Sequence, residues 1–166
     1  MTMAEMAEKV RFEGEFAETK FGKNLFFCDK KNKARMWVVI AAADTTIDLK
    51  ALTKILGCGS GNLRAGSEEA MYEKLGAKKG ALTLFSLIND KDKSVELVLD
   101  KRLQEEFSFV GFHPMTNEAT TAISKENMMQ VIALSSHEPK VLNFAEMAPP
   151  ATDAPQKKQK PEKQPK

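Results

Sequence analysis

The sequence contains few of the residues from which metal centres are built, with 2 histidines and 2 cysteines among 166 residues. Neither His113 nor His137 has a Cys, Asp or Glu at a recurring metal-ligand spacing. Cys28 and Cys58 form no C-x-x-C pair and no Cys/His pattern. We therefore expect no metal site.

Long apolar runs and export signals are also lacking. The longest apolar run, MWVVIAAA, has eight residues, whereas a membrane-spanning helix needs ~20. The first ten residues, MTMAEMAEKV, are acidic rather than a basic segment followed by an apolar one. The sequence predicts no membrane partner and a soluble protein in a reducing, cytoplasmic setting.

An overall basic excess is missing from the body of the chain. The net charge is +2, and the last stretch, Pro149 to Lys166, holds five lysines against Asp153 and Glu162. This tail has no large apolar residue, so we expect one domain over 1–148 and a disordered tail over 149–166. A body without basic excess gives no general sign of nucleic-acid binding.

One segment of the body is locally basic. Lys20 to Arg35 has five lysines and one arginine against Asp29 alone. Such a run is either a solvated hairpin tip or a surface for phosphates, and the composition leaves both open.

The order of strand and helix signals predicts an α+β domain with a mixed, largely antiparallel sheet flanked by helices. Runs of β-branched and apolar residues indicate strands, and apolar residues at helical spacing between Ser and Gly caps indicate helices. The expected elements are a hairpin of Asn24–Phe27 with Trp37–Ala43, helices over Leu49–Leu56 and Ser67–Gly76, a second hairpin of Leu82–Ile88 with Val95–Leu99, strands over Phe107–Phe112 and Thr120–Ile123, a helix over Lys125–Ser136 capped by Ser124, and a last strand over Val141–Phe144.

The two histidines have different settings. His113 precedes Pro114, which favours an extended backbone, and it ends a strand, where side chains commonly face clefts. It is either a functional group or a structural one, and spacing does not decide between them. His137 follows a predicted helix, where an imidazole can contact the last carbonyls, so a capping role is favoured.

Two glycine segments and one lysine are further candidates. Gly57 to Gly61 lacks the GK[ST] of a phosphate-binding loop and is interpreted as a helix-ending loop. Gly80 to Thr83 precedes a predicted strand, so its N–H groups either face a ligand or form a plain turn. Lys23, beside Asn24 and among aromatic residues, is either a surface lysine or a ligand contact.

Six blocks of the sequence, taken together, resemble the YbaK/ProX family of aminoacyl-tRNA editing domains, and in particular its free-standing prolyl-tRNA synthetase-associated, ProXp-ala type. The similarity runs in order from about Met3 to Phe144. The blocks are GKNLFFCDKKNKARMWVV, DLKALTKILGCGSGNLRAGSEEAMYEKLG, GALTLFSLIND, VELVLD, FHPMTNEATTAIS and HEPKVLNF.

The resemblance implies a curved mixed sheet and hydrolysis of the ester that joins a wrong amino acid, typically alanine, to tRNA specific for proline, without metal or organic cofactor. The family's key lysine and its partner asparagine fall on Lys23 and Asn24, and the histidine of the H-P motif falls on His113. The family's G-x-x-x-P loop falls on Gly80 to Leu84, where Leu84 replaces the usual proline.

The resemblance also implies a role for each residue. A pocket that accepts proline discriminates poorly against alanine, since a methylene is worth only ~1–3 kcal/mol, so a second, smaller pocket is required. His113 and Asn24 would line it, and Lys23 would contact the terminal adenosine or its phosphate. The Gly80 loop, with Ala81, Leu82 and Thr83, would stabilise the oxyanion while water attacks with help from a ribose hydroxyl. The acceptor arm would lie on Lys20, Lys30, Lys31, Lys33 and Arg35, together with the lysine-rich tail.

The resemblance leaves three functions to compare. The first is a trans-acting deacylase for Ala-tRNA specific for proline, and the second is an editing enzyme for Cys- or Ser-tRNA. The third is a non-catalytic adaptor that binds tRNA or joins a prolyl-tRNA synthetase complex. Family members usually carry a helix and a strand before the segment that matches Thr2 to Met6, so either this chain is truncated there or its fold closes without those elements.

Overall fold

A long hairpin forms the centre of the fold, as its β-branched and aromatic residues predict. In the computed structural model, which describes residues 10–147, β1 (Lys20–Asp29) pairs antiparallel with β2 (Met36–Ala42). Every residue of β2 is buried, because its apolar side chains are covered on both faces of the sheet. The predicted hairpin is confirmed.

The strands form one mixed sheet, in the order β6-β5-β1-β2-β4-β7, and β3 pairs with β1 outside this path. Within the described residues the β1–β2, β1–β3 and β5–β6 pairings are antiparallel, whereas β1–β5, β2–β4 and β4–β7 are parallel. The predicted α+β class with a mixed sheet is confirmed, and its parallel share is larger than expected. The remaining strands are β3 (Leu63–Ala65), β4 (Val95–Asp100), β5 (Phe109–Phe112), β6 (Thr121–Ser124) and β7 (Pro139–Leu142).

Side-chain caps start the three longest α-helices. Asp48 accepts from the N–H groups of Lys50 and Ala51, and Ser67 and Ser124 each accept from an N–H three residues later. Such caps satisfy N–H groups that have no partner inside the helix, and the predicted serine caps are confirmed. The helices are α2 (Leu49–Ile55), α3 (Glu68–Leu75) and α5 (Lys125–Leu134), with shorter turns at η1 (Gly14–Phe16), η2 (Leu84–Asn89), α4 (Arg102–Glu105) and α6 (Phe144–Met147).

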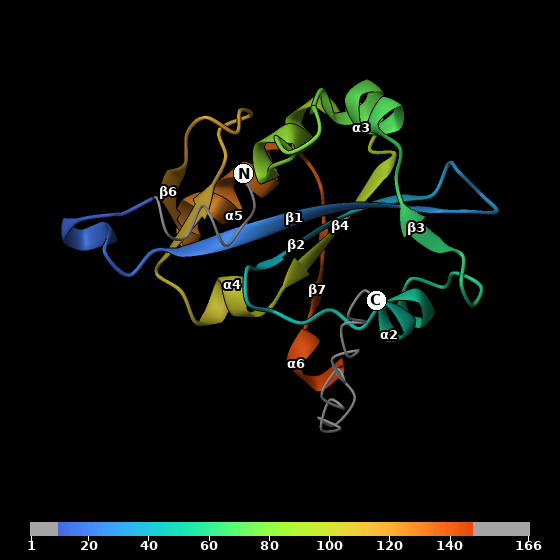
Figure 1. Cartoon of the computed structure of the whole chain (residues 1–166), viewed down its shortest axis with the longest axis horizontal. Coiled ribbons are helices and arrows are strands. Elements are labelled where there is room, and N and C mark those ends of the chain that lie inside the picture. The colour runs from blue at the N-terminus through green and yellow to red at the C-terminus, as the bar shows by residue number, and fades with distance from the viewer. Residues whose placement is uncertain (1–9, 148–166) are drawn as a thin grey trace, which may run out of the picture.

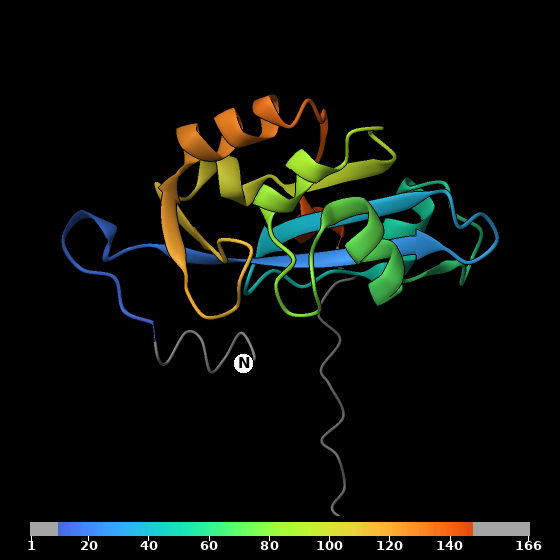
Figure 2. The same cartoon turned by 90° about the horizontal axis from the view of Figure 1, so that it is seen from above.

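Helices lie on both faces of the sheet (Figures 1 and 2), and the sheet separates two apolar cores. Even-numbered residues of the hairpin, such as Phe26 and Val38, pack with α3, η2 and α5. Odd-numbered ones, such as Phe27 and Trp37, pack with α2 and α6. Because neighbouring residues of a strand point to opposite faces, the parity of a residue in β1 tells which core its side chain faces.

The prediction of a second hairpin is wrong. Residues of the segment predicted as a strand form the 3-10 helix η2, and β4 pairs in parallel with β2 instead. Leu84 and Leu87, three residues apart, are fully buried, whereas Ile88 is exposed. This spacing matches the three-residue turn of a 3-10 helix and not the alternation of a strand.

Two earlier expectations lie outside the described residues. These are the missing elements around Thr2 to Met6 and the disordered tail over 149–166. Over the part of the chain that the structure describes, no helix has both the length and the apolar character to cross a bilayer.

Candidate functional site

A gap in the sheet opens beside the middle of β1. One edge of β1 pairs with β2, whereas the other edge pairs with β5 at its first two residues and with β3 at its last three. Among the described strands, none covers this second edge in between. The Phe21 carbonyl accepts from Ala43 on the β2 side, so strand alternation turns the main-chain N–H and C=O of Asn24 into the gap.

The gap lies at a cleft of about 610 Å³. Asn24 lines it from β1, Gly80 and Leu82 line it from the loop before η2, and His113 lines it directly after β5. The structure thus brings together four residues that the sequence singled out, from three segments far apart in the chain. Lining residues that sequence reasoning missed include Phe26, Gly66, Glu68, Met71 and Lys79.

Some of these missed residues carry signals that could have been found. Gly66 precedes the cap Ser67, and a Cβ at Gly66 would lie 2.3 Å from Cδ1 of Phe26, so only glycine lets the Phe26 ring lie against this backbone. Glu68 forms an ion pair of 2.9 Å with Lys79. This pair connects the start of α3 to the residue before Gly80.

His113 presents one ring nitrogen that has no partner among the described residues. Its Nδ1 lies 3.0 Å from the carbonyl oxygen of Ala119. A carbonyl only accepts, so Nδ1 carries the proton, and in the neutral ring Nε2 is an acceptor. His113 is half-buried and lines the cleft.

The loop at Gly80 has two N–H groups that also lack a hydrogen-bond partner among the described residues. Gly80 has a φ of +81°, which glycine adopts without steric cost. Ala81 donates to the Lys78 carbonyl at 3.0 Å and Thr83 donates to the Ser86 hydroxyl at 3.3 Å. Within the described residues the N–H groups of Gly80 and Leu82 have no acceptor. Ala81 and Thr83 are buried away from the cleft lining, so the structure places only part of the predicted loop in the site.

Leu84, which replaces the proline of the family's loop, begins η2 and is fully buried. Proline is well tolerated at the first position of a helix, because its fixed φ suits that position and its missing N–H is not needed there. Leu84 keeps the same helix start and fills the core beneath the loop.

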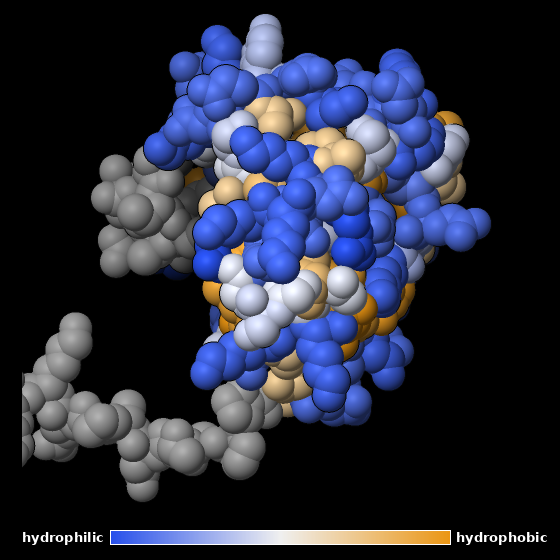
Figure 3. Space-filling model, turned by 90° about the vertical axis from the view of Figure 1, so that its right-hand side faces the viewer, coloured by the Kyte–Doolittle hydropathy of each residue, from blue (hydrophilic) through white to orange (hydrophobic). Residues whose placement is uncertain are grey.

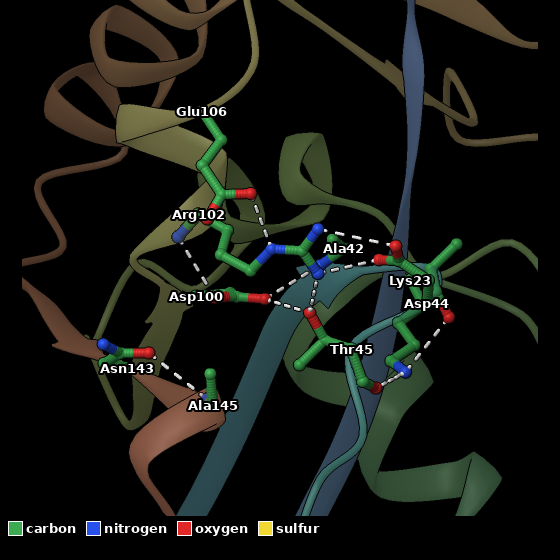
Figure 4. Close-up of polar contacts among 10 residues, drawn as sticks. Lys23, Ala42, Asp44, Thr45, Asp100, Arg102, Glu106, Asn143 and Ala145 are labelled. Atoms are coloured by element: carbon green, nitrogen blue, oxygen red, sulfur yellow. Dashed lines mark hydrogen bonds and ion pairs between the residues drawn. The ribbon is translucent and has the colours of Figure 1, made fainter.

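Asn24 and Lys23 turn their polar ends to different surroundings. The side-chain oxygen of Asn24 is buried and has no hydrogen-bond partner. The ammonium of Lys23 donates to the carbonyl oxygens of Ala43, at 3.2 Å, and Thr45 (Figure 4). Lys23 lines the cleft, yet strand parity directs its charged end to the opposite side from the Asn24 amide. The structure therefore does not bring this ammonium together with His113.

Burial lowers the pKa of Lys23, and the charges of Asp44 and Asp100 oppose that shift. These carboxylates belong to a polar network that holds the turn after β2 (Figure 4). Asp100 is fully buried and accepts from Ala42 N at 3.2 Å and from the Thr45 hydroxyl at 2.5 Å.

Arg102 completes this network. It donates to both carboxylate oxygens of Asp44, at 2.9 and 3.4 Å, and to Glu106 at 2.8 Å. Its hydrogen bond holds the pKa of Asp44 below the usual range. The network fixes the carbonyls that bind Lys23, and sequence reasoning missed it because its members lie 57 and 58 residues apart.

The predicted basic cluster divides into separate places. Lys20 begins β1, whereas Lys30, Lys31 and Lys33 follow its end, and ten residues of strand span about 30 Å. Arg35 is engaged elsewhere: it donates to the carbonyls of helix-ending residues at 2.6 and 3.2 Å and lies 3.8 Å from Asp29. The exposed lysines are free of ion pairs within the described residues, and Arg35 has a structural role.

His137 is buried, and the capping role predicted for it is confirmed. Its Nδ1 lies 3.0 Å from the carbonyl of Ser135 at the end of α5, and its Nε2 lies 3.1 Å from Asp90. Burial acts to raise the pKa of Asp90, but hydrogen bonds from Val95, His137 and Ser94 outweigh it and hold that pKa below its usual value.

A metal centre has no candidate ligands in the described part of the chain, where no three His, Cys, Asp or Glu side chains gather as one would require. Cys58 is also no reactive thiolate, because burial and the nearby Asp29 raise its pKa. The polar groups that line the cleft are backbone amides, the imidazole of His113, the amide of Asn24 and the charged side chains of Lys23, Glu68 and Lys79.

Comparison with known proteins agrees with the family resemblance found in the sequence. Residues 1–131 match the family model described as the aminoacyl-tRNA editing domain. The chain is 46% identical over 123 residues to mouse (Mus musculus) prolyl-tRNA synthetase associated domain-containing protein 1, covering 74% of this chain and 72% of that protein. It is 35% identical over 122 residues to the prolyl-tRNA editing protein ProX of Acetoanaerobium sticklandii, with coverages of 74% and 72%.

A solved structure shares the fold. The crystal structure of a hypothetical protein superposes with a TM-score of 0.53 at 16% sequence identity, covering 70% of this chain and 71% of the other. At this identity the likeness concerns the fold alone. The family model covers most of the chain, and the curated relatives match it at 35% identity and above. The chain is therefore a member of the aminoacyl-tRNA editing domain family of the YbaK/ProX type.

Proposed function

We propose that this chain hydrolyses the ester of mischarged tRNA in trans, with Ala-tRNA specific for proline as its substrate. The observation that carries the proposal is the cleft at the sheet gap, where two N–H groups, the Nε2 of His113 and the side-chain oxygen of Asn24 all lack partners within the described residues. Of these groups the Asn24 oxygen is buried, and a buried polar atom without a partner costs about 1–3 kcal/mol. A buried acceptor beside further free donors and acceptors in one cleft is expected where a polar ligand supplies the missing partners.

The two donors suit the charge that develops during ester hydrolysis. When a nucleophile attacks the ester carbonyl, its oxygen becomes an oxyanion, and fixed backbone N–H groups stabilise it without having to reorganise. The N–H groups of Gly80 and Leu82 are the free donors of the loop. The sequence analysis expected the whole loop from Gly80 to Thr83 to stabilise the oxyanion, and the proposal limits this role to the N–H groups of Gly80 and Leu82.

The nucleophile is proposed to be water. The described lining of the cleft holds no Ser, Thr or Cys side chain, so a covalent intermediate on such a residue has no support. His113 Nε2 can accept a proton from the attacking water or from a ribose hydroxyl of the tRNA. In both arrangements the attacking oxygen would lie close to the free N–H groups of Gly80 and Leu82.

Selection of the small amino acid is proposed to depend on the apolar wall. Phe26, Met71 and Leu82 line the cleft beside Asn24, and they limit the room for an amino-acid side chain. The specificity for tRNA that accepts proline is supported by the name of the bacterial relative, a prolyl-tRNA editing protein.

Incubation of the protein with purified Ala-tRNA for proline, and with the same tRNA carrying proline, Cys or Ser, tests the proposal. We expect loss of the alanyl ester with the prolyl ester spared. Replacement of His113 by Ala should slow that loss while leaving the fold intact by circular dichroism. No loss of any ester, with tRNA still bound, would instead select a non-catalytic adaptor, and loss of the Cys or Ser ester alone would change the substrate.

A further inference from the structure

A second hollow, of about 560 Å³, lies on the α2 side of the sheet, and β3 separates it from the cleft. Leu63 and Arg64 of β3 line this hollow, whereas the next residues, Ala65 and Gly66, line the cleft. A strand that leaves the cleft would therefore reach the hollow by passing around β3, which pairs only with β1 among the described strands. We call it the basic groove, defined by Lys50, Lys54, Arg64, Leu49, Cys58 and Leu63.

Three cations line the basic groove. Lys50 and Lys54 lie four residues apart on α2, so they share one face of the helix. Arg64 faces them from β3. None of the three has an ion pair within the described residues, and the nearest helix carboxylate, Asp48, is engaged as the cap of α2. The groove therefore presents uncompensated positive charge.

One further lysine and two carboxylates lie near the basic groove. The N–H of Lys30 donates to the Asn62 carbonyl at 2.8 Å, which places another exposed lysine beside the loop that forms one wall. Asp29 and Glu96 are the carboxylates whose charges reach Cys58. Asp29 is bound to Arg35 and to the N–H of Lys31.

The floor and rim of the groove fit a sugar-phosphate strand better than a base. Cys58 and Leu63 are buried apolar residues and Leu49 is half-exposed. Among the described residues, no aromatic side chain lines the groove. Base stacking relies mainly on aromatic rings, and Arg64 offers the one guanidinium plane among the described lining residues, whereas all three cations can contact phosphates. Figure 3 shows this end of the molecule largely covered by hydrophilic residues.

We propose that the basic groove binds the phosphates of the tRNA strand that directly precede the esterified terminal nucleotide. This inference rests on the proposed function, because it takes the cleft as the site of the terminal nucleotide. It moves the tRNA contact from the hairpin tip and Lys20, where the sequence suggested it, to α2 and β3. The strand would run from the cleft around β3 and between Lys54 and Arg64.

The test is a triple variant, Lys50→Gln, Lys54→Gln and Arg64→Gln, compared with a control triple of the same charge change, Lys91→Gln, Lys101→Gln and Lys125→Gln. Affinity for uncharged tRNA is measured as a function of salt. Three lost phosphate contacts should reduce the log-log salt slope by about 2.1 to 2.7, which is about 0.7 to 0.9 for each contact. Between about 50 and about 200 mM salt, the wild type should therefore weaken about 20- to 40-fold more than the groove variant.

A second substrate separates this inference from the proposed function. Alanyl ester on adenosine alone carries none of the phosphates that precede the terminal nucleotide, so the groove variant should hydrolyse it as the wild type does. On full tRNA the KM of the groove variant should rise at least about tenfold at low salt, with kcat unchanged. An unchanged salt slope, or an equal change in the control triple, would overturn the groove. Failure of the wild type to hydrolyse either ester would overturn the proposed function, while the salt slope would still test the groove.

Discussion

The two sides of β1 differ in how their polar groups are satisfied. Around Lys23 the polar groups of Asp100, Arg102 and Asp44 are hydrogen-bonded to one another or to the backbone. On the cleft side the Asn24 oxygen and the Nε2 of His113 have no partner among the described residues. Groups of the first kind hold a fold together, whereas groups of the second kind are available to a ligand. Substitutions on the two sides should therefore affect different measurements.

The largest effect is expected from Asp100→Ala. This change leaves the Ala42 N–H, the Thr45 hydroxyl and the Arg102 N–H without their buried acceptor. The free energy of unfolding should fall by about 3–5 kcal/mol, measured by urea denaturation. Asp44→Asn, at a carboxylate whose side chain is 74% exposed, is the matched control and should cost about 1 kcal/mol or less. Equal losses in the two variants would contradict the distinction between buried and exposed partners.

The next effect is expected from Gly80→Ala, which acts on activity. A Cβ at Gly80 meets nothing closer than Asn117 Nδ2 at 3.7 Å, so strain from the positive φ, about 1–2 kcal/mol, displaces the loop without a clash. Misplaced oxyanion donors should lower kcat about 100-fold in a deacylation assay. Gly14→Ala introduces the same strain at φ +62° in open space and should leave kcat unchanged.

A smaller effect is expected from Asn24→Leu. The buried oxygen without a partner is removed, so the free energy of unfolding should stay equal or rise, whereas kcat/KM should fall about tenfold through the loss of one ligand hydrogen bond. Asn89→Leu is the opposite case, because its amide donates to the Leu75 carbonyl at 2.9 Å. It should lose about 1 kcal/mol of stability and no activity. If Asn24→Leu destabilised the fold as Asn89→Leu does, the cleft would be an ordinary part of the core.

The smallest effect concerns pH. The folded-state pKa of Asp90 lies below its unfolded value of about 3.9. Its contribution to stability is therefore present above about pH 4 and is lost as the pH falls through the folded value. Unfolding free energies of the wild type and Asp90→Asn, measured from pH 6 downward in the acid range, should converge below about pH 4. A constant difference across that range would exclude the carboxylate's charge as the cause.

Local signals predicted a large part of this fold. The serines before α3 and α5 and the β-branched residues of β2 determine elements from within a few residues. The segment at Leu84 to Ile88 was mistaken for a strand, because a short apolar run fits either period until its packing partners are known. The parallel pairing of β2 with β4 depends on contacts across the chain that no local pattern encodes.

The sequence predicted which residues belong to the candidate site better than it predicted how they are arranged. The family resemblance singled out Asn24, Gly80 and His113, which meet at the cleft. Strand parity already implied that Lys23 and Asn24 face opposite sides, and that signal was not used. The division of Lys20 from Lys30 likewise follows from the length of β1.

The gap in the sheet also bears on how the protein avoids pairing with itself. An open strand edge normally invites another chain to add a strand, and long flat edges lead to aggregation. Here the open stretch is short and is bounded at both ends, by β5 and by β3. A neighbouring chain could pair only with the few residues of β1 between these two contacts, so the sheet offers little room for an added strand at this edge.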